Sequence, residues 1–195
     1  MEQFNQQLFL ILNATPNSSH WTMVLAHFFA QQAIMMIPAA ALIGWLWVPR
    51  RELIVKMLIT LCIAMILAKI IQAIYPHARP FVEGVGYQFL AHANSDSFPS
   101  NHGTAAFAFA LAFIFWGRMI YGAAFLIIAL GIAWSRIYLG VHWPMDMVGG
   151  FLVALLACCL TDLIWSGLGK QVLNKLEMFY RRIFATLIQR CWVKY

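Results

Sequence analysis

Residues 135–146 read S-R-I-Y-L-G-V-H-W-P-M-D, and this short polar stretch separates two long apolar runs. The guanidinium of Arg136 can hold an oxyanion through a planar fork of donors. His142 can attack a substrate or carry a proton, and Asp146 can fix which ring nitrogen holds that proton. Pro144 is typical of the first turn of a helix, where a carboxylate such as that of Asp146 is stabilised. The stretch therefore predicts a reactive site at the point where a new helix begins.

The composition is that of an integral membrane protein. Of the 195 residues, 63% are hydrophobic and 10% are charged, and the mean hydropathy is +0.75. Soluble domains carry about 45–50% apolar and about 25% charged residues. Residues 1–4 lack the basic start of a cleavable signal peptide, so we expect no cleavage. We expect a single all-α bundle without a second, soluble domain.

Five apolar segments are long enough, at roughly 20 residues each, to cross a hydrocarbon core about 30 Å thick. They are residues 21–48, 53–75, 101–116, 119–135 and 144–168. Residues 1–20 are too polar to span, so they predict an interfacial helix that ends near residues 15–17. The prediction is a polytopic membrane helix bundle, with a membrane-embedded domain at 1–168. The basic, amphipathic segment 169–195 is typical of a helix on the cytoplasmic membrane surface.

Local features refine these spans. Two glutamines and a proline in the first span predict a protein-facing side and a kink: Gln31, Gln32 and Pro38. Small residues recur every four positions in the last span, so that face can approach another helix closely: Gly150, Ala154 and Cys158. The cysteines fit no metal-binding spacing and are interpreted as small buried hydrophobes: Cys62, Cys158, Cys159 and Cys191.

The net charge of +6 reflects membrane topology rather than a nucleic-acid partner. Ten of the 13 basic residues fall in or beside one set of loops: Arg50, Arg51, Lys56, Arg118, Lys170, Lys175, Arg181, Arg182, Arg190 and Lys194. The other three, Lys69, Arg79 and Arg136, fall on the opposite side. This asymmetry follows the positive-inside rule, so we expect the N-terminus outside and the C-terminus inside. Residues 76–100 and 135–146 then share the outer face.

The loop at 76–100 carries two further polar clusters. Arg79 precedes a proline just after the second span, and residues 97–104 read S-F-P-S-N-H-G-T at the start of the third. A helix that begins near Ser100 points unpaired N–H groups outward, which favours an anion. Ser100 can cap that helix or donate its hydroxyl to the anion, and Gly103 leaves the first turn open. Together with Arg136, these groups suit phosphoryl transfer without a metal or other cofactor.

The other histidines have no partner pattern. We interpret His20, His27 and His92 as interfacial or structural residues. His77 and Glu83 flank the first cluster, so they are the best candidates for residues that support the site.

Three motifs together resemble the signature of the type 2 phosphatidic acid phosphatase superfamily. They are residues 79–80 (R-P), residues 99–102 (P-S-N-H) and S-R-x5-H-x3-D at 135–146. The blocks F-P-S-N-H-G-T and R-I-Y-L-G-V-H resemble its bacterial undecaprenyl-diphosphate phosphatase branch, which includes bacitracin-resistance proteins. The resemblance covers about residues 5–165. The usual motif lysine is replaced by Gln72, so either Lys69 supplies the charge from one turn deeper or Gln72 donates a neutral hydrogen bond.

The resemblance implies a role for each matching residue. His142 would take the phosphoryl group as a phosphohistidine, and Asp146 would hold its other ring nitrogen. His102 would protonate the leaving group and later activate water. The phosphate oxygens would be held by side chains and first-turn amides: Arg79, Arg136, Ser100, Asn101 and Gly103, with Lys69 and Gln72 as further candidates.

The implied activity is dephosphorylation of undecaprenyl diphosphate at the periplasmic face of the bacterial cytoplasmic membrane, which recycles the lipid carrier for cell-wall synthesis. The expected partners are this polyprenyl lipid and membrane lipids, and the sequence indicates no particular protein partner. One alternative has the same chemistry with another lipid, as a lipid A phosphotransferase or a phosphatidylglycerophosphate or phosphatidic acid phosphatase. A more remote alternative is a non-enzymatic membrane protein.

Overall fold

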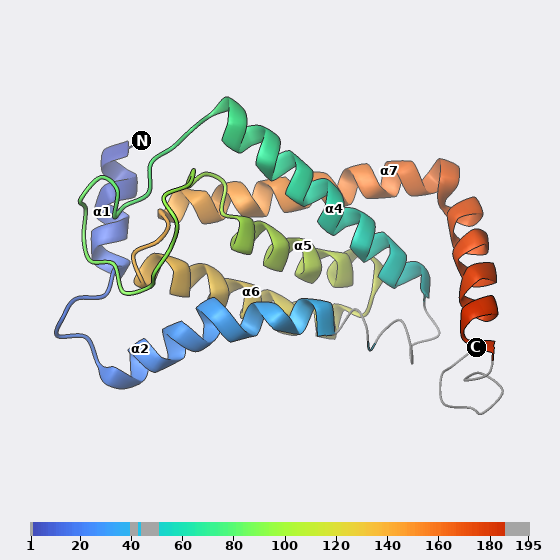
Figure 1. Cartoon of the computed structure of the whole chain (residues 1–195), viewed down its shortest axis with the longest axis horizontal. Coiled ribbons are helices and arrows are strands. Elements are labelled where there is room, and N and C mark those ends of the chain that lie inside the picture. Colours follow the sequence, from blue (N-terminus) through green and yellow to red (C-terminus); the bar gives the residue numbers. More distant parts are fainter. Residues whose placement is uncertain (1, 40–42, 44–50, 186–195) are drawn as a thin grey trace.

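The computed structural model describes residues 2–39, 43 and 51–185, and all regular secondary structure in these ranges is helical (Figure 1). The elements are α1 (Glu2–Leu12), α2 (His20–His27), η1 (Phe28–Gln32), η2 (Ala33–Met35), α4 (Arg51–Ile74), α5 (Asn101–Trp116), α6 (Met119–Tyr138) and α7 (Pro144–Ile183). The long helices run side by side as an elongated bundle. The predicted all-α membrane bundle is confirmed.

Among the described residues, four helical segments are long and apolar enough to cross a membrane: His20–Ala39, Arg51–Ile74, Met119–Tyr138 and Pro144–Gly169. The predicted third span is α5, which has 16 residues and packs against α4, α6 and α7. At 1.5 Å per residue it is about 24 Å long, shorter than a hydrocarbon core. A short central helix enclosed by longer ones leaves its N-terminus recessed at one end of the bundle.

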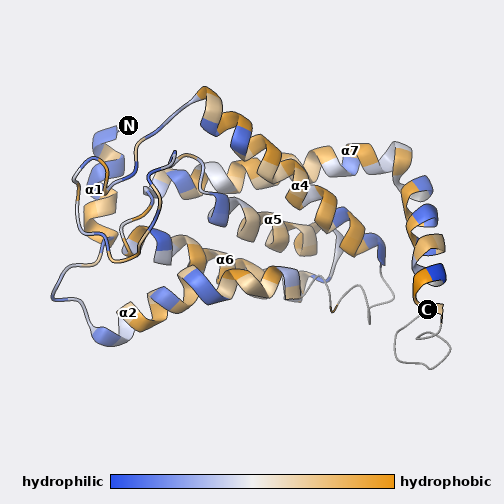
Figure 2. Cartoon of the chain, in the orientation of Figure 1, coloured by the Kyte–Doolittle hydropathy of each residue, from blue (hydrophilic) through white to orange (hydrophobic). Residues whose placement is uncertain are grey.

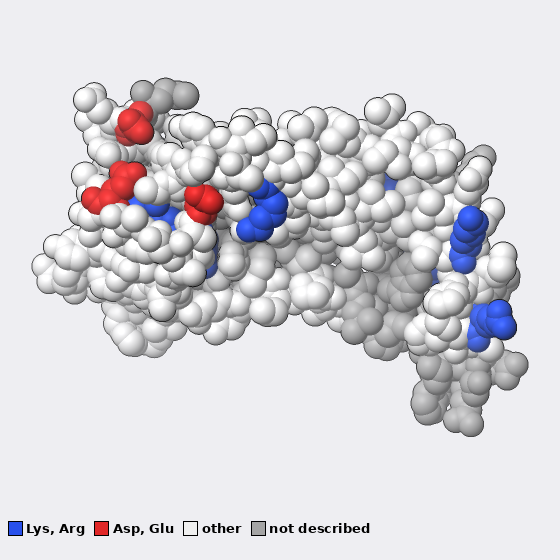
Figure 3. Space-filling model, turned by 45° about the horizontal axis from the view of Figure 1, so that its top comes forward, with Lys and Arg blue, Asp and Glu red and all other residues white. Residues whose placement is uncertain are grey.

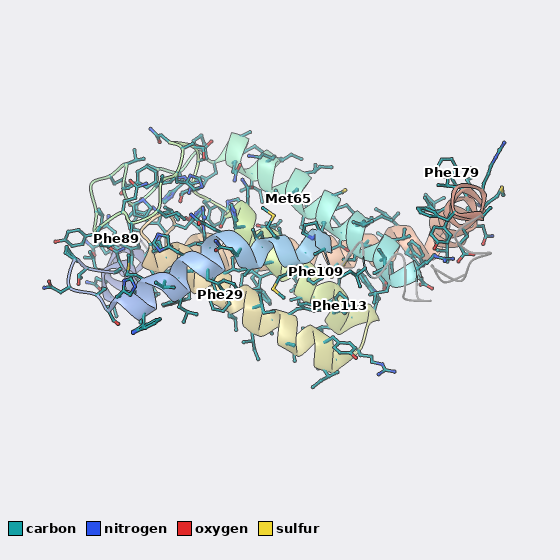
Figure 4. The ribbon with its side chains drawn as sticks, turned by 60° about the horizontal axis from the view of Figure 1, so that its bottom comes forward. Phe29, Met65, Phe89, Phe109, Phe113 and Phe179 are labelled. Atoms are coloured by element: carbon teal, nitrogen blue, oxygen red, sulfur yellow. The ribbon has the colours of Figure 1, made fainter. Side chains whose placement is uncertain are left out.

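Hydrophobic residues predominate along the bundle helices (Figure 2), and many of the large ones are exposed, as a lipid solvent requires. Ile66, Ile127 and Leu163 are exposed large hydrophobics on three different helices. Inside, Phe125 packs against Phe109 and Phe113 at ring-centroid distances of 4.7 and 4.9 Å, and Figure 4 labels the latter two. The side chains that face outward therefore contribute to membrane insertion, and those inside to helix packing.

The close-approach face predicted on the last span is confirmed. Ala154 and Cys158 are buried, and a Cβ at Gly150 would come within 3.0 Å of the backbone nitrogen of Thr104 on α5. The small residues thus let α7 lie close against α5. This contact joins the two helices whose first turns carry candidate site residues.

Two sequence interpretations are wrong. Gln31 and Gln32 are exposed rather than facing protein, because the helix changes to π and then 3-10 geometry over residues 28–35 and turns Ala30 and Ala33 inward. The kink predicted for this span stays a prediction. Of the three described cysteines, only Cys158 is buried as expected. Cys62 and Cys159 are exposed. An apolar thiol costs little on a lipid-facing surface. Cys191 lies outside the described residues.

Several boundaries differ from prediction. Helix α1 ends at Leu12, earlier than residues 15–17, and lies across one end of the bundle (Figure 1). Helix α6 continues to Tyr138, three residues beyond the predicted end, which places Arg136 in its last turn. The segment after Gly169 is a continuation of α7 that bends across the opposite end. The end of the first span, at residues 44–48, and the tail at 186–195 lie outside the described residues.

Charge separates along the bundle as predicted. On the face shown in Figure 3, the acidic side chains gather at the end that carries α1, and the opposite end shows basic side chains alone. Arg51 and Lys56 begin α4 and Arg118 precedes α6 at that basic end. Arg50, Arg190 and Lys194 lie outside the described residues.

Candidate active site

Two connections meet at the end of the bundle that carries α1: residues 75–100, between α4 and α5, and residues 139–143, between α6 and α7. The second connection turns back at Gly140, whose φ of 78° suits glycine. The amide of Val141 donates to the carbonyl oxygen of Arg136 at 3.1 Å. A side chain at Gly140 would also collide with the backbone of Tyr87, so the turn lets the two connections touch.

His142 and Asp146 form a buried pair at the start of α7. Nδ1 of His142 lies 3.0 Å from Oδ2 of Asp146, and both side chains are almost fully buried. Pro144 opens the helix, so the four-residue spacing places histidine and carboxylate on one side of its first turn. The amide of Trp143 also donates to Oδ2, at 2.8 Å. The carboxylate therefore favours the proton on Nδ1 and leaves the lone pair on Nε2.

Arg79 faces that lone pair. Its Nη1 lies 3.0 Å from Nε2 of His142 and donates to the carbonyl oxygen of Val141 at 2.7 Å. Its Nε donates to the Ser95 carbonyl at 2.8 Å, and Nη2 donates to Ser95 Oγ and the Asp96 carbonyl at 3.3 and 3.1 Å. All five N–H donors of the guanidinium are thus engaged. Arg79 ties residues 95–96 to the histidine, and a phosphate oxygen would have to exchange with one of these contacts.

Arg136 differs from Arg79 because some of its donors have no hydrogen-bond partner among the described residues. It is 3% exposed in the last turn of α6, and among the described residues its Nε and Nη2 have no hydrogen-bond partner. A buried guanidinium with unpaired donors is costly unless a ligand completes it. The field of Arg136 reaches both His142 and Arg79. Its open donors are therefore suited to the oxygens of a phosphoryl group next to the histidine.

The recessed N-terminus of α5 lies beside these residues and completes the site. Ser100 caps this helix, its Oγ accepting from the amide of Gly103 at 3.2 Å, which is the first of the two alternatives for this hydroxyl. The Ser100 amide donates to the backbone carbonyl of Asp146 at 3.2 Å. This bond joins the second and third motifs directly. His102, in the first turn of α5, is half-buried and lies within electrostatic range of Arg136 and His142.

Lys69 and Gln72 form one chain of hydrogen bonds. Nζ of Lys69 donates to Oε1 of Gln72 at 3.0 Å. Nε2 of Gln72 donates to the Pro99 carbonyl at 3.0 Å and to Oδ1 of Asn101 at 3.1 Å. These contacts fix the approach to α5, and Lys69 reaches the site through Gln72. A direct contact of either residue with phosphate stays a prediction.

Burial controls the ionisation of the central histidine. The pKa of His142 is lowered to about 4, mainly by desolvation and also by the charges of Arg79 and Arg136, against the raising effect of Asp146. The ring is therefore neutral at physiological pH, as a nucleophile must be. Burial also lowers the pKa of Arg79, although the carboxylates of Asp146 and Asp96 raise it.

Sequence reasoning missed three site residues. Ser97 donates to Oδ2 of Asp146, and Ser95 binds Arg79 as described. His92, interpreted as interfacial or structural, packs edge to face on His142 with ring centroids 6.1 Å apart. Ser97 lies beside a recognised motif, but neither Ser95 nor His92 has a spacing signal because the path of the loop brings them in.

The remaining flanking residues occupy supporting positions. His77 packs against Trp143 with ring centroids 6.4 Å apart, beside the histidine and aspartate of the third motif. Glu83 is exposed, and its amide donates to the Arg79 carbonyl at 3.1 Å. His27 spans from Met23 to Phe89 through its two ring nitrogens, at 2.8 and 3.2 Å, as a structural residue does.

The chain belongs to the PAP2 superfamily, whose model matches residues 53–169 and so includes every motif of the site. It is similar along its whole length to a protein of Escherichia coli (strain K12) named "Putative undecaprenyl-diphosphatase YbjG". The two are 43% identical over 196 aligned residues, covering 100% of this chain and 99% of the relative. It is also 32% identical to the undecaprenyl-diphosphatase BcrC of Bacillus subtilis (strain 168), over 75% of this chain and 78% of that protein.

Two solved structures have the same fold. The crystal structure of Aquifex aeolicus LpxE matches with a TM-score of 0.70 at 22% identity, over 81% of this chain and 94% of that one. The PAP2 type phosphatidylglycerolphosphate phosphatase of Bacillus subtilis matches with a TM-score of 0.60 at 22% identity, over 85% and 86%. The fold is therefore that of transmembrane PAP2 proteins.

Proposed function

We propose that this protein hydrolyses undecaprenyl diphosphate to undecaprenyl phosphate through a phosphohistidine intermediate. The observation that carries the proposal is the arrangement of His142, with Asp146 on one ring nitrogen and Arg79 beside the other. A neutral imidazole with its Nε2 lone pair facing the Arg79 guanidinium, in the field of Arg136, is suited to attack an anionic phosphorus. The names of the two relatives supply the substrate.

In this mechanism, Nε2 of His142 attacks the terminal phosphorus, and the bond from phosphorus to the bridging oxygen breaks. His102 gives a proton to the departing lipid phosphate and then takes one from the water that cleaves the phosphohistidine. Arg136 binds the equatorial oxygens with its open donors, and the substrate oxygens exchange for one of the contacts of Arg79. The ionised carboxylate of Asp146 stabilises the cationic ring that the attack creates.

We further propose that the site faces the periplasm in a bacterial cytoplasmic membrane. The support is the charge distribution: Arg51, Lys56 and Arg118 lie at the opposite end of the bundle from the site. Residues 1–168 would then form the membrane-embedded phosphatase domain, and the basic segment after them would lie on the cytoplasmic surface. Cysteine labelling of Glu83 and Lys175 variants in intact cells tests this: reagent that cannot cross the membrane should reach position 83 alone.

The substrate is tested by comparing phosphate release from undecaprenyl diphosphate, phosphatidylglycerophosphate and phosphatidic acid by the purified protein. We expect the highest kcat/KM for undecaprenyl diphosphate. A higher value for either other lipid would assign the protein to the alternative phosphatase class. Transfer of the phosphoryl group to added lipid A instead of water would make it a phosphotransferase. A folded preparation that releases phosphate from none of these lipids would support the non-enzymatic alternative.

The intermediate is tested with substrate labelled in its terminal phosphate. The His102→Ala variant should accumulate an acid-labile, base-stable protein label, because leaving-group departure is slowed less than hydrolysis of the intermediate. His142→Ala should take up no label and lose activity by about 10⁴-fold or more. The matched control is His20→Ala, since His20 is an exposed residue of α2 that should leave turnover unchanged. Label retained in His142→Ala would refute this nucleophile.

A further inference from the structure

Asp146 is bound asymmetrically. Its Oδ2 accepts hydrogen bonds from the Ser97 hydroxyl, from Nδ1 of His142 and from the amide of Trp143. Its Oδ1 is buried and, among the described residues, has no hydrogen-bond partner. A carboxylate has about four acceptor sites on its two oxygens, and here all three donors converge on Oδ2.

The hydroxyl of Ser97 belongs to this arrangement by geometry. Ser97 is fully buried, and its Oγ lies 3.4 Å from Nδ1 of His142 as well as within hydrogen-bonding distance of Oδ2. Its amide donates to the His77 carbonyl at 2.8 Å, which fixes the backbone from which the hydroxyl projects. Three residues later, the Ser100 amide binds the Asp146 carbonyl. The segment between α4 and α5 thus holds Asp146 at two points, its carboxylate through Ser97 and its backbone carbonyl through Ser100.

We propose that Ser97 is a positioning residue for the nucleophile, which acts through Asp146 by occupying part of the hydrogen-bonding capacity of Oδ2. The inference rests on the proposed function of His142. The Ser97 hydroxyl holds Oδ2 within hydrogen-bonding distance of Nδ1, so the proton stays on Nδ1 and Nε2 keeps its direction toward phosphorus. Because Oδ2 accepts hydrogen bonds from three donors, it stabilises the protonated form of His142 less strongly. Nε2 therefore stays free of a proton.

The charged and titratable groups around His142 determine how readily its ring is protonated. They come from the loop before α5 and from α5, α6 and α7: Arg79, His92, His102, Arg136 and Asp146. All except Asp146 are cationic or can become so, and they disfavour protonation of the ring. Asp146 is the one member of this set that favours it. The donor that moderates Asp146 therefore moves the pH at which the histidine becomes protonated.

The test measures kcat, KM and the pH dependence of kcat/KM for Ser97→Ala with undecaprenyl diphosphate and with phosphatidic acid. Without the hydroxyl, Oδ2 stabilises the protonated imidazolium more strongly. The carboxylate is also less fixed, so it orients the ring less well. We expect kcat to fall about ten- to hundredfold with KM nearly unchanged. The acid limb of kcat/KM should move to higher pH. Ser97→Thr, which keeps the hydroxyl, should restore both the rate and the position of the limb.

Two further variants separate positioning from folding. Ser97→Cys keeps the size of the side chain with a weak donor, and it should show the same displaced limb even if Ser97→Ala fails to fold. Ser166→Ala removes a hydroxyl that donates to the Leu163 carbonyl at 2.7 Å on the exposed side of α7, and it should match the parent protein. A rate loss with an unmoved limb, or a Ser97→Ala protein that behaves like the parent, overturns the inference.

The outcome is distinguishable from failure of the proposed function. If His142→Ala hydrolyses these lipids as the parent does, the nucleophile is wrong. If His142→Ala is inactive and the Ser97 variants keep the parent rate and pH profile, the nucleophile stands and the role of Ser97 is wrong.

Discussion

The two ends of the bundle treat buried cations in opposite ways. At the end that carries the site, Arg79 and Arg136 are buried side by side without a carboxylate in a salt bridge to either, among the described residues. At the other end, the buried Lys56 lies 3.2 Å from Glu52 and 3.6 Å from Asp162. Within the described ranges, one end therefore leaves its buried guanidinium groups without a carboxylate in a salt bridge, and the other pairs its buried lysine with two carboxylates.

Aromatic rings complete the basic end. Nζ of Lys56 lies 5.2 Å from the ring centroid of Trp116 and 5.3 Å from that of Trp165. The guanidinium of Arg51 lies 3.9 Å over the ring of Tyr180, in the part of α7 that bends across this end. Figure 4 shows the neighbouring Phe179 far from Phe89 of the site loop. These contacts join α4, α5 and α7 and serve the fold.

The difference in the partners of the buried cations at the two ends identifies which cations are available for a ligand. A cation with acidic and aromatic neighbours is already satisfied, whereas a buried pair of guanidinium groups awaits negative charge from elsewhere. In the proposed mechanism the substrate phosphate supplies that charge. Distances to counter-ions thus separate functional from structural arginines and lysines where burial alone does not.

The largest effect that would break this comparison is expected at Arg136. Arg136→Lys keeps the charge but removes the planar fork, so kcat/KM should fall by about 10²- to 10³-fold. Steady-state phosphate release from undecaprenyl diphosphate measures it, with thermal unfolding in the same detergent to confirm an intact fold. Activity within a factor of about two of the parent would show that Arg136 acts as a point charge only.

The pH profile sharpens the comparison at the site end. Because the pKa of His142 is lowered to about 4, the neutral nucleophile is present above that pH and is lost as the pH falls through it. We expect kcat/KM to be insensitive to this group near neutrality and to fall about tenfold per unit below pH 4. Recovery of activity on return to neutral pH controls for unfolding. An acid limb near the ordinary histidine pKa of about 6.5 would contradict the burial argument.

The smallest effect is expected at the basic end, in Lys56→Met. The ion pairs and ring contacts of Lys56 are lost, but its partners Glu52 and Asp162 are 52% and 66% exposed and remain hydrated. The protein should be destabilised by about 1 kcal/mol, with kcat/KM unchanged. Thermal unfolding and phosphate release on one preparation measure both quantities. A large loss of activity at normal stability would mean that the two ends are coupled.

Much of the fold and the site was predictable because its signals are local. Hydrophobic segment lengths indicated the spans, and the placement of basic residues brought residues 76–100 and 135–146 to one end. Pro144 marked the start of α7 and Ser100 the start of α5, so Asp146 and His102 could be placed in first turns. Predicted boundaries failed where helices continued past a polar residue, as α6 does through Arg136.

By itself, the sequence determined the class of fold, the common face of the motifs and the chemistry of the histidine, arginine and aspartate residues. Only the tertiary structure decided how the hydrogen bonds are shared. In the structure, Arg79 donates hydrogen bonds to residues 95–96, and the Ser97 hydroxyl donates to Asp146. Two donor nitrogens of Arg136 have no partner among the described residues. The physical reason is that apolar periodicity and helix starts depend on neighbours in the chain. The partner of a buried polar atom depends on the path of a loop through space, which local patterns do not encode.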